Sequence, residues 1–166
     1  MKFVSIIMGS KSDYEVVYEA AKILNEFGVA YEMIVSSAHR SPARTAKYVA
    51  DAEKKGAQVF ICAAGMAAHL AGAVAANTTK PVLGVPLSGS ALSGVDALYS
   101  TVQMPAGIPV ATLAIGKAGA KNAAYLAVQI LALSDEVLSS KLKADRAAKA
   151  ETLKKDSEQI EVLLEG

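Results

Sequence analysis

Short apolar runs recur along the chain, and each is followed by a turn signal. They are continuous and rich in β-branched residues, which is typical of strands that are covered on both faces of a sheet. The five runs span Phe3–Met8, Ala30–Val35, Gln58–Ala63, Pro81–Pro86 and Pro109–Ile115. This pattern predicts five buried strands.

The segments between these runs have apolar residues at helical spacing. In the first segment, apolar residues recur from Val16 to Phe27 and the pattern stops at Gly28. The pattern of the second segment begins after Pro42 and stops at Gly56. Glycine is favoured just past a helix end, so both glycines indicate helix termini. The second segment is predicted to be helical over Ala43–Lys55. Three further helices are predicted, over Ala67–Ala76, Val95–Val102 and Lys121–Leu133.

Strand and helix therefore alternate along most of the chain. Such alternation implies right-handed crossovers between parallel strands, with helices on both faces of the sheet. We predict an α/β fold with a three-layer, doubly wound parallel sheet in the flavodoxin-like order 2-1-3-4-5.

The chain changes character after Leu133. Ser134 is a candidate helix N-cap, with Asp135 and Glu136 in the favourable first turn. The apolar positions that follow flank a polar middle, as is typical of a surface helix; they are Val137, Leu138, Leu142, Ile160, Leu163 and Leu164. We predict one domain, in which residues 1–133 form the α/β part and residues 134–166 a C-terminal helical extension.

Composition narrows the expected partners and compartment. The 166 residues carry 17 basic and 16 acidic side chains, so no large electrostatic field favours nucleic acid or an anionic membrane. The N-terminal apolar run is too short for a signal peptide, and no run reaches the ~18 residues of a transmembrane helix. The single cysteine, Cys62, lies in an apolar run, which favours a buried thiol in a reducing compartment. We expect a soluble, cytoplasmic protein.

The predicted strand order brings three loops to one place. Strand 1 lies between strands 2 and 3, so the loops after these strands open at the same carboxyl edge of the sheet, where doubly wound sheets bind ligands. These loops are Gly9–Asp13, Ser36–Arg40 and Ala64–His69, and they contain both histidines of the chain.

The first loop favours an anion. It joins a strand to a helix, where free backbone N–H groups and the helix dipole attract a phosphate. Its sequence G-S-K-S-D matches neither an ATP-binding P-loop nor a dinucleotide fingerprint. Arg40 from the neighbouring loop is able to bind the same phosphate through its forked guanidinium. The alternative is that Ser12 or Asp13 only caps the helix and that Arg40 is a solvated charge.

His39 is the candidate acid or base. Histidine as a residue type exchanges a proton near neutral pH, and His39 follows a strand at the ligand-binding edge. The alternative is that His39 only hydrogen-bonds within its loop, and for His69 that alternative is stronger. The two histidines and Cys62 form no recognised metal spacing, and the chain lacks the G-x-S-x-G sequence of a serine hydrolase. The residues alone indicate an anion-binding α/β domain with a histidine beside a phosphate pocket.

The loops resemble those of one enzyme family. G-S-K-S-D after strand 1, S-A-H-R-S-P after strand 2, A-A-H-L after strand 3 and the stretch from Leu92 to Gly116 are similar, in the same order, to motifs of the class I N5-carboxyaminoimidazole ribonucleotide mutases, the phosphoribosylaminoimidazole carboxylase catalytic subunit family. The resemblance covers roughly Val4 to Leu133. Relatives that carboxylate aminoimidazole ribonucleotide directly carry lysine after the loop histidine and G-R-S-N after strand 3, so Arg40 and Ala67–His69 favour the mutase.

The resemblance implies an isomerase of purine (IMP) biosynthesis that moves a carboxylate from the exocyclic nitrogen of an aminoimidazole ribonucleotide to C4. It implies no metal, ATP or organic cofactor, and a homo-octamer with shared active sites. His39 matches the catalytic histidine and Arg40 the phosphate-binding arginine. The other matched substrate-binding positions are Ser10, Ser12, Asp13, Ser37, Gly65, Ala67, Ala68, His69 and Leu70. The backbone N–H groups of Gly65 to Ala68 are expected to face the migrating carboxylate.

The third loop departs from the family pattern G-A-G-G-A-A-H-L-P-G at three positions, Ala63, Met66 and Ala71. Met66 replaces a glycine, and a position that needs positive φ resists a side chain. Two other functions stay open: direct carboxylation of aminoimidazole ribonucleotide with carbon dioxide, and a noncatalytic nucleotide-binding subunit.

Overall fold

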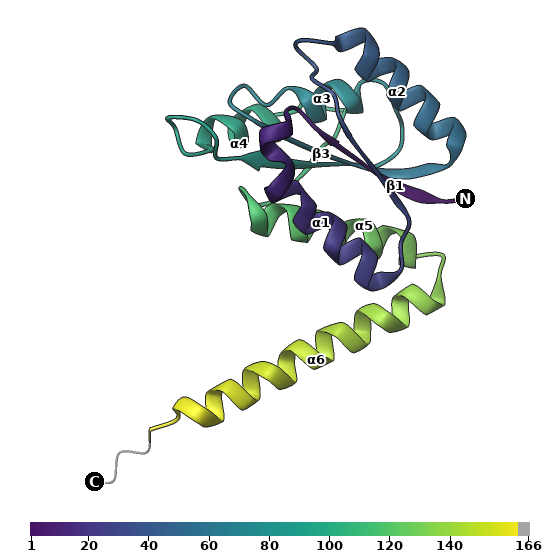
Figure 1. Cartoon of the computed structure of the whole chain (residues 1–166). Helices are drawn as coiled ribbons and strands as arrows, with labels where there is room; N and C mark the ends of the chain where they lie inside the picture. Colours follow the sequence, from purple (N-terminus) through teal and green to yellow (C-terminus); the bar gives the residue numbers. More distant parts are fainter. Residues whose placement is uncertain (163–166) are drawn as a thin grey trace. The chain divides into compact units, whose positions relative to one another are not determined.

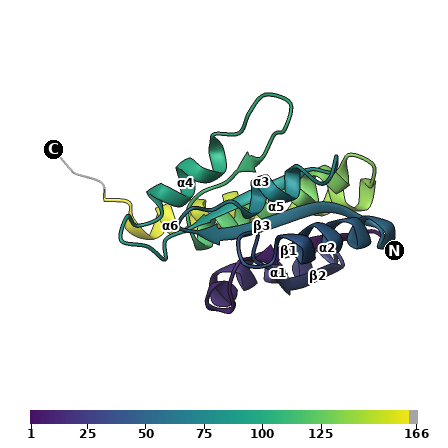
Figure 2. The ribbon, with the colours of Figure 1, turned by 90° about the horizontal axis from the view of Figure 1, so that it is seen from above.

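A five-stranded, all-parallel sheet forms the centre of the computed structural model, which describes residues 1–162. The strand order is β2-β1-β3-β4-β5, so the predicted order is confirmed, and Figure 2 shows β2, β1 and β3 side by side. The strands span Phe3–Met8 (β1), Tyr31–Val35 (β2), Ala57–Gly65 (β3), Val82–Leu87 (β4) and Ala111–Thr112 (β5).

Helices cover both faces of this sheet. After β1 come the short 3-10 helix η1 (Lys11–Asp13) and α1 (Tyr14–Phe27); the later helices are α2 (Pro42–Lys55), α3 (Leu70–Ala75), α4 (Val95–Val102) and α5 (Lys117–Ala132). Helices α1 and α5 lie on one face and α2, α3 and α4 on the other (Figure 1). Helices α1 and α2 end at Gly28 and Gly56 in the left-handed conformation, as predicted.

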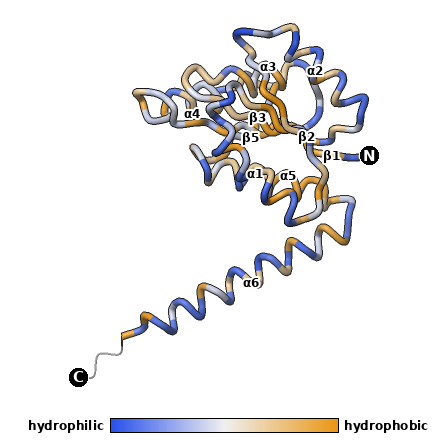
Figure 3. The backbone as a smooth tube through the Cα atoms, in the orientation of Figure 1, coloured by the Kyte–Doolittle hydropathy of each residue, from blue (hydrophilic) through white to orange (hydrophobic). Residues whose placement is uncertain are grey.

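The core lies between the helices and the two faces of the sheet. Every residue of β1 and β4 is buried, which explains why these strands read as continuous apolar runs. The strands are the most hydrophobic part of the chain in Figure 3. Gly84 of β4 allows α4 to approach closely, because a Cβ at this position would collide with the Thr101 side chain.

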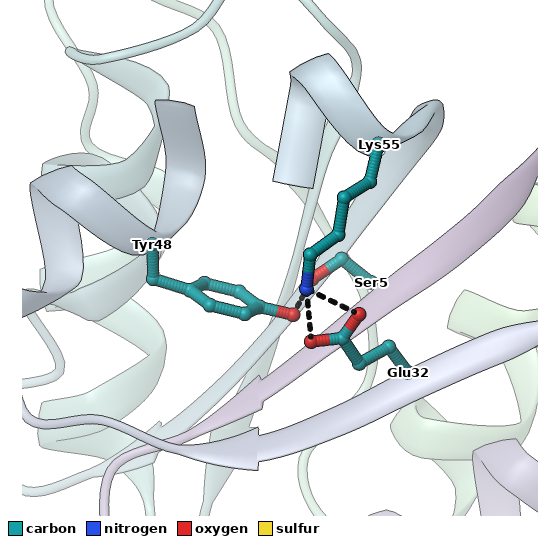
Figure 4. Close-up of polar contacts among 4 residues, drawn as sticks. All are labelled: Ser5, Glu32, Tyr48 and Lys55. Atoms are coloured by element: carbon teal, nitrogen blue, oxygen red, sulfur yellow. Dashed lines mark hydrogen bonds and ion pairs between the residues drawn. The ribbon is translucent and has the colours of Figure 1, made fainter. Parts of the chain in front are cut away.

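Polar side chains attach α2 to the sheet near its C-terminal half (Figure 4). The Tyr48 hydroxyl lies 2.9 Å from the hydroxyl of the buried Ser5, and Lys55 pairs with Glu32 at 3.3 Å. Burial raises the pKa of Tyr48 to about 12, and the nearby Glu32 adds to this effect. Helix α2 is therefore fixed to both β1 and β2.

Three predicted boundaries are wrong by three residues or more. Strand β5 has two residues, because regular pairing with β4 covers only Ala111 and Thr112 and Pro109 has no N–H to donate. Helix α3 begins at Leu70 and not at Ala67, because the amides before it are used in a turn. Helix α5 begins at Lys117, where the chain leaves Gly116 with a positive φ of 76°.

The chain divides into two compact units, residues 1–128 and 129–166. The second unit contains α6 (Glu136–Ile160), a single helix with no buried residue, and Figure 3 shows it as mostly hydrophilic. Its N-cap is Asp135, not Ser134, because the Asp135 carboxylate accepts the N–H groups of Val137 and Leu138 at 3.0 Å each. The predicted apolar positions Leu163 and Leu164 lie outside the described residues. No helix within residues 1–162 is long and apolar enough to cross a membrane.

Candidate functional site

A pocket of about 590 Å³ opens at the carboxyl edge of the sheet, where the loops after β1, β2 and β3 meet. It contains every residue predicted for the site except Ala68. The lining residues are Gly9, Ser10, Ser12, Asp13, Ser37, Ala38, His39, Arg40, Ala64, Gly65, Met66, Ala67, His69, Leu70, Leu87 and Gly89. Leu87 is the last residue of β4 and Gly89 lies in the loop after it. Both were missed by the sequence reasoning, although β4 borders β3 at the same edge.

The loop after β1 is closed by a capping box. The Ser10 N–H donates to the Asp13 carboxylate at 3.0 Å, and the Ser10 hydroxyl accepts from the Ser12 N–H at 3.3 Å. The Ser12 hydroxyl lies 2.9 Å from the Ser10 hydroxyl. Thus Ser10 caps η1 with help from Asp13, and both residues also face the pocket. Burial raises the pKa of Asp13, while hydrogen bonds from Ser10 and Ser12 and the charge of Arg40 oppose this shift.

The loop after β2 carries His39 and Arg40 at its tip. The Ser37 hydroxyl accepts the Arg40 N–H at 3.1 Å, and the Ser37 carbonyl accepts the Ser41 N–H at 2.9 Å. The Arg40 guanidinium donates to the Gly9 carbonyl at 3.2 Å. This bond places the guanidinium against the loop after β1, as the sequence reasoning required for a shared anion site.

The two histidines of the chain are neighbours. The His39 and His69 rings lie edge to face, with centroids 5.3 Å apart and planes at 75°. Both side chains are exposed, and both line the pocket. A reacting group bound in this pocket therefore has access to two imidazoles that come from different strand ends.

The loop after β3 turns sharply at Met66, which has a φ of 59° and is 64% exposed. The Ala68 N–H donates to the Met66 carbonyl at 2.8 Å, and the His69 N–H donates to the Ala67 carbonyl at 2.7 Å. Ala68 is buried behind the pocket wall. The Ala68 amide, one of those expected to face the migrating carboxylate, is thus engaged within the turn.

The wall beside this turn is apolar, because Ala67, Leu70 and Leu87 line it. Within residues 1–162, no three His, Cys, Asp or Glu side chains gather closely enough to hold a metal ion. The site thus combines an imidazole pair, one guanidinium, one carboxylate, three serines and a small apolar wall.

Comparisons with known proteins agree with this geometry. The sequence profile of the AIR carboxylase family matches residues 3–152. N5-carboxyaminoimidazole ribonucleotide mutase of Vibrio cholerae is 54% identical over 150 residues, which cover 90% of this chain and 93% of that protein. The Escherichia coli K12 protein of the same name is 54% identical over 148 residues, covering 89% of this chain and 88% of that protein. The Bacillus subtilis protein of the same name is 51% identical over 157 residues, which cover 95% of this chain and 97% of that protein.

The fold has a close match among solved structures. The crystal structure of Treponema denticola PurE superposes with a TM-score of 0.88 at 27% sequence identity, and the alignment covers 98% of this chain and 100% of that one. The profile match spans most of the chain, and the relatives exceed half identity over nearly their full length. This chain belongs to the AIR carboxylase family.

Proposed function

We propose that the protein is an N5-carboxyaminoimidazole ribonucleotide mutase, an isomerase of purine biosynthesis that moves the carboxylate from N5 to C4 by decarboxylation and recarboxylation. The observation that carries this proposal is that His39, Arg40 and the capped loop after β1 line one pocket. Relatives that bear the mutase name and are 51% to 54% identical to this chain support it.

Different polar residues of the pocket are suited to bind the phosphate and the ribose of a ribonucleotide. Arg40 and the Ser10 and Ser12 hydroxyls bind the phosphate, since a guanidinium and hydroxyl donors suit its oxygens. Asp13 accepts hydrogen bonds from ribose hydroxyls, because its carboxylate would repel a phosphate. Ser37 lines the same pocket as His39. The nucleotide is thus held by contacts that do not change during the reaction.

His39 moves one proton in each half of the reaction. The imidazolium gives its proton to the exocyclic nitrogen, the N–CO2 bond breaks, and carbon dioxide and the free amine form. Electrons of the aminoimidazole ring then attack carbon dioxide through C4, and a C4–CO2 bond forms. The neutral imidazole removes the C4 proton, which restores the aromatic ring and the imidazolium. Protons and electrons balance, so the cycle needs no second base.

The apolar wall retains carbon dioxide between the two steps. Ala67, Leu70 and Leu87 offer the gas no hydrogen bonds and exclude water from the reacting face. His69 lies 5.3 Å from His39, ring centroid to centroid, and this proximity supports a role for His69 in binding the migrating carboxylate.

Direct carboxylation of aminoimidazole ribonucleotide is the second candidate, because the matching family is described as AIR carboxylase. The two functions are separated by supplying N5-carboxyaminoimidazole ribonucleotide alone, or aminoimidazole ribonucleotide with saturating bicarbonate, both without ATP. Formation of the C4 carboxylate from the first substrate supports the mutase. Efficient turnover of the second substrate while the first is ignored supports the carboxylase.

We also propose that the chain works as a cytoplasmic homo-octamer with shared active sites, without nucleic acid or membrane partners. Large apolar side chains around α4 are exposed, and these support a subunit contact: Leu92, Val95, Tyr99, Val102 and Ile108. A hollow of about 350 Å³ joins this region to the site, since His39, His69, Ser100 and Met104 line it. The free, buried thiol of Cys62 fits a reducing compartment.

A further inference from the structure

Two buried hydroxyl groups lie at the base of the loop that carries His39 and Arg40. Ser36 follows β2 and is 0% exposed, and Thr45 lies near the start of α2 and is 3% exposed. Their side-chain oxygens are 2.8 Å apart. Neither residue lines the pocket of about 590 Å³, so neither touches the substrate in the proposed reaction.

The Thr45 hydroxyl connects this pair to the loop backbone. Its oxygen lies 3.1 Å from the Ser41 carbonyl and 3.4 Å from the Ser37 carbonyl. A hydroxyl has one hydrogen to donate and accepts with its lone pairs. Both hydroxyls are satisfied when Ser36 donates to Thr45 and Thr45 donates to these carbonyls. The hydrogen bonds then run from β2 through Thr45 to both ends of the loop.

The loop depends on these bonds for its position. The Ser41 N–H and hydroxyl both donate to the Ser37 carbonyl, at 2.9 and 3.0 Å, which closes the loop below His39 and Arg40. A hollow of about 450 Å³ lies beside it and is lined in part by Ala38, Thr45 and His69. On this side Ala38 packs against the core, and beside the open hollow the hydrogen bonds supply the remaining support of the loop.

Helix α2 gives the hydrogen bonds a fixed base. Tyr48 and Lys55 attach the helix to Ser5 and Glu32 of the sheet (Figure 4). Thr45 precedes these contacts on the same helix and faces the loop. We propose that Thr45 is a positioning residue, whose hydroxyl holds His39 against His69 and Arg40 against the Gly9 carbonyl. This inference rests on the proposed mutase function, because its effect is read in that reaction.

Three variants test the inference. Thr45→Val keeps the shape of the side chain but removes the hydroxyl, and Thr45→Ser keeps the hydroxyl. The double variant Ser36→Ala/Thr45→Val removes both polar groups, and replacing both partners by apolar groups leaves stability nearly unchanged. Thr101→Val is the matched control, since Thr101 is also a buried helical threonine that bonds its own helix, at the Ala97 carbonyl.

We expect Thr45→Val to lower kcat/KM by about 10- to 100-fold, as small misplacements of catalytic groups do. Both kcat and KM change, because the loop carries the proton-transfer residue His39 and the phosphate-binding residue Arg40. Thr45→Ser restores most of the activity. The double variant recovers the denaturation midpoint of the wild type while its kcat stays low, and Thr101→Val keeps wild-type kcat at the assay temperature.

Recovery of kcat together with stability in the double variant would overturn the inference, because Thr45 would then act only on folding. Wild-type kcat in Thr45→Val would overturn it as well. If Thr45→Val does not fold, the double variant and Thr45→Ser decide the question. Absence of mutase activity in the wild type is a different result, which refutes the proposed function and not the placement of the loop.

Discussion

Arg40 reaches from the loop after β2 to the Gly9 carbonyl, next to the serines of the capped turn. We expect Arg40→Ala to weaken substrate binding by about 1.5–3 kcal/mol, the range for a hydrogen bond to a charged group. Titration calorimetry with the ribonucleotide measures this change. Arg44→Ala is the control, because Arg44 is also exposed but donates to the Val35 carbonyl outside the pocket. Equal affinities for Arg40→Ala and the wild type would refute the phosphate assignment.

Met66 holds a backbone conformation that favours glycine, with a φ of 59°. The left-handed conformation costs a residue with a side chain about 1–2 kcal/mol, and glycine loses about 0.5–1 kcal/mol more backbone entropy than alanine. We therefore expect Met66→Gly to raise the free energy of unfolding by about 0.5–1 kcal/mol, as measured by urea denaturation. A lower stability would show that the Met66 side chain makes contacts that outweigh its backbone strain.

The residues of the site were partly predictable from sequence. His39 and Arg40 follow a strand that the predicted order places at the ligand-binding edge, and the structure puts both in the pocket. The engagement of the Ala68 amide was not predictable, because it depends on the turn that Met66 starts. The Ser36–Thr45 pair was also missed, since hydroxyl residues at the base of a loop have no sequence signature of their own.

At the scale of elements, buried strands and glycine-terminated helices were predicted well. Strand β1 and helix α4 have the predicted bounds. The errors fall where local backbone bonds decide the boundary: the edge strand β5 is short, the turn after Met66 delays α3, and Asp135 rather than Ser134 accepts the first amides of α6. Hydrophobic periodicity carries no information on which of two adjacent polar residues accepts an amide.

The contact between Tyr48 of α2 and Ser5 of β1 predicts that the free energy of unfolding depends on pH. The pKa of Tyr48 is raised from 10.0 to about 12 in the folded protein, so the folded state keeps this proton longer than the unfolded chain does. This stabilisation is complete below pH 10 and is lost as pH rises toward 12. We expect the unfolding free energy of the wild type to fall more steeply from pH 10 to 12 than that of Tyr48→Phe.

Chemical denaturation at a series of pH values measures the two slopes. Tyr14→Phe, which removes the hydroxyl of a tyrosine that is 48% exposed, is expected to keep the wild-type slope. Tyr48→Phe also leaves the buried Ser5 hydroxyl without its partner, which lowers stability at neutral pH by about 1–3 kcal/mol. Parallel slopes for Tyr48→Phe and the wild type would contradict the assigned role of Tyr48.

At the scale of the whole molecule, the exposed apolar side chains around α4 predict assembly. We expect light scattering after size exclusion to give a mass about eight times the 17.1 kDa of one chain. Tyr99→Lys places a charge on this surface and is expected to shift the mass toward smaller species, because an unpaired charge is costly to bury. A monomeric wild type, or an unchanged mass for Tyr99→Lys, would contradict the proposed contact.

The central claim is that His39 transfers the protons of a carboxylate migration. The most direct measurement compares the conversion of N5-carboxyaminoimidazole ribonucleotide to its C4 isomer by the wild type and by His39→Asn, without ATP or bicarbonate. The account predicts rapid conversion by the wild type, and kcat lower by about 10²–10⁴-fold in His39→Asn, with nucleotide binding retained. Decarboxylation alone by the wild type, or unchanged turnover by His39→Asn, would contradict it.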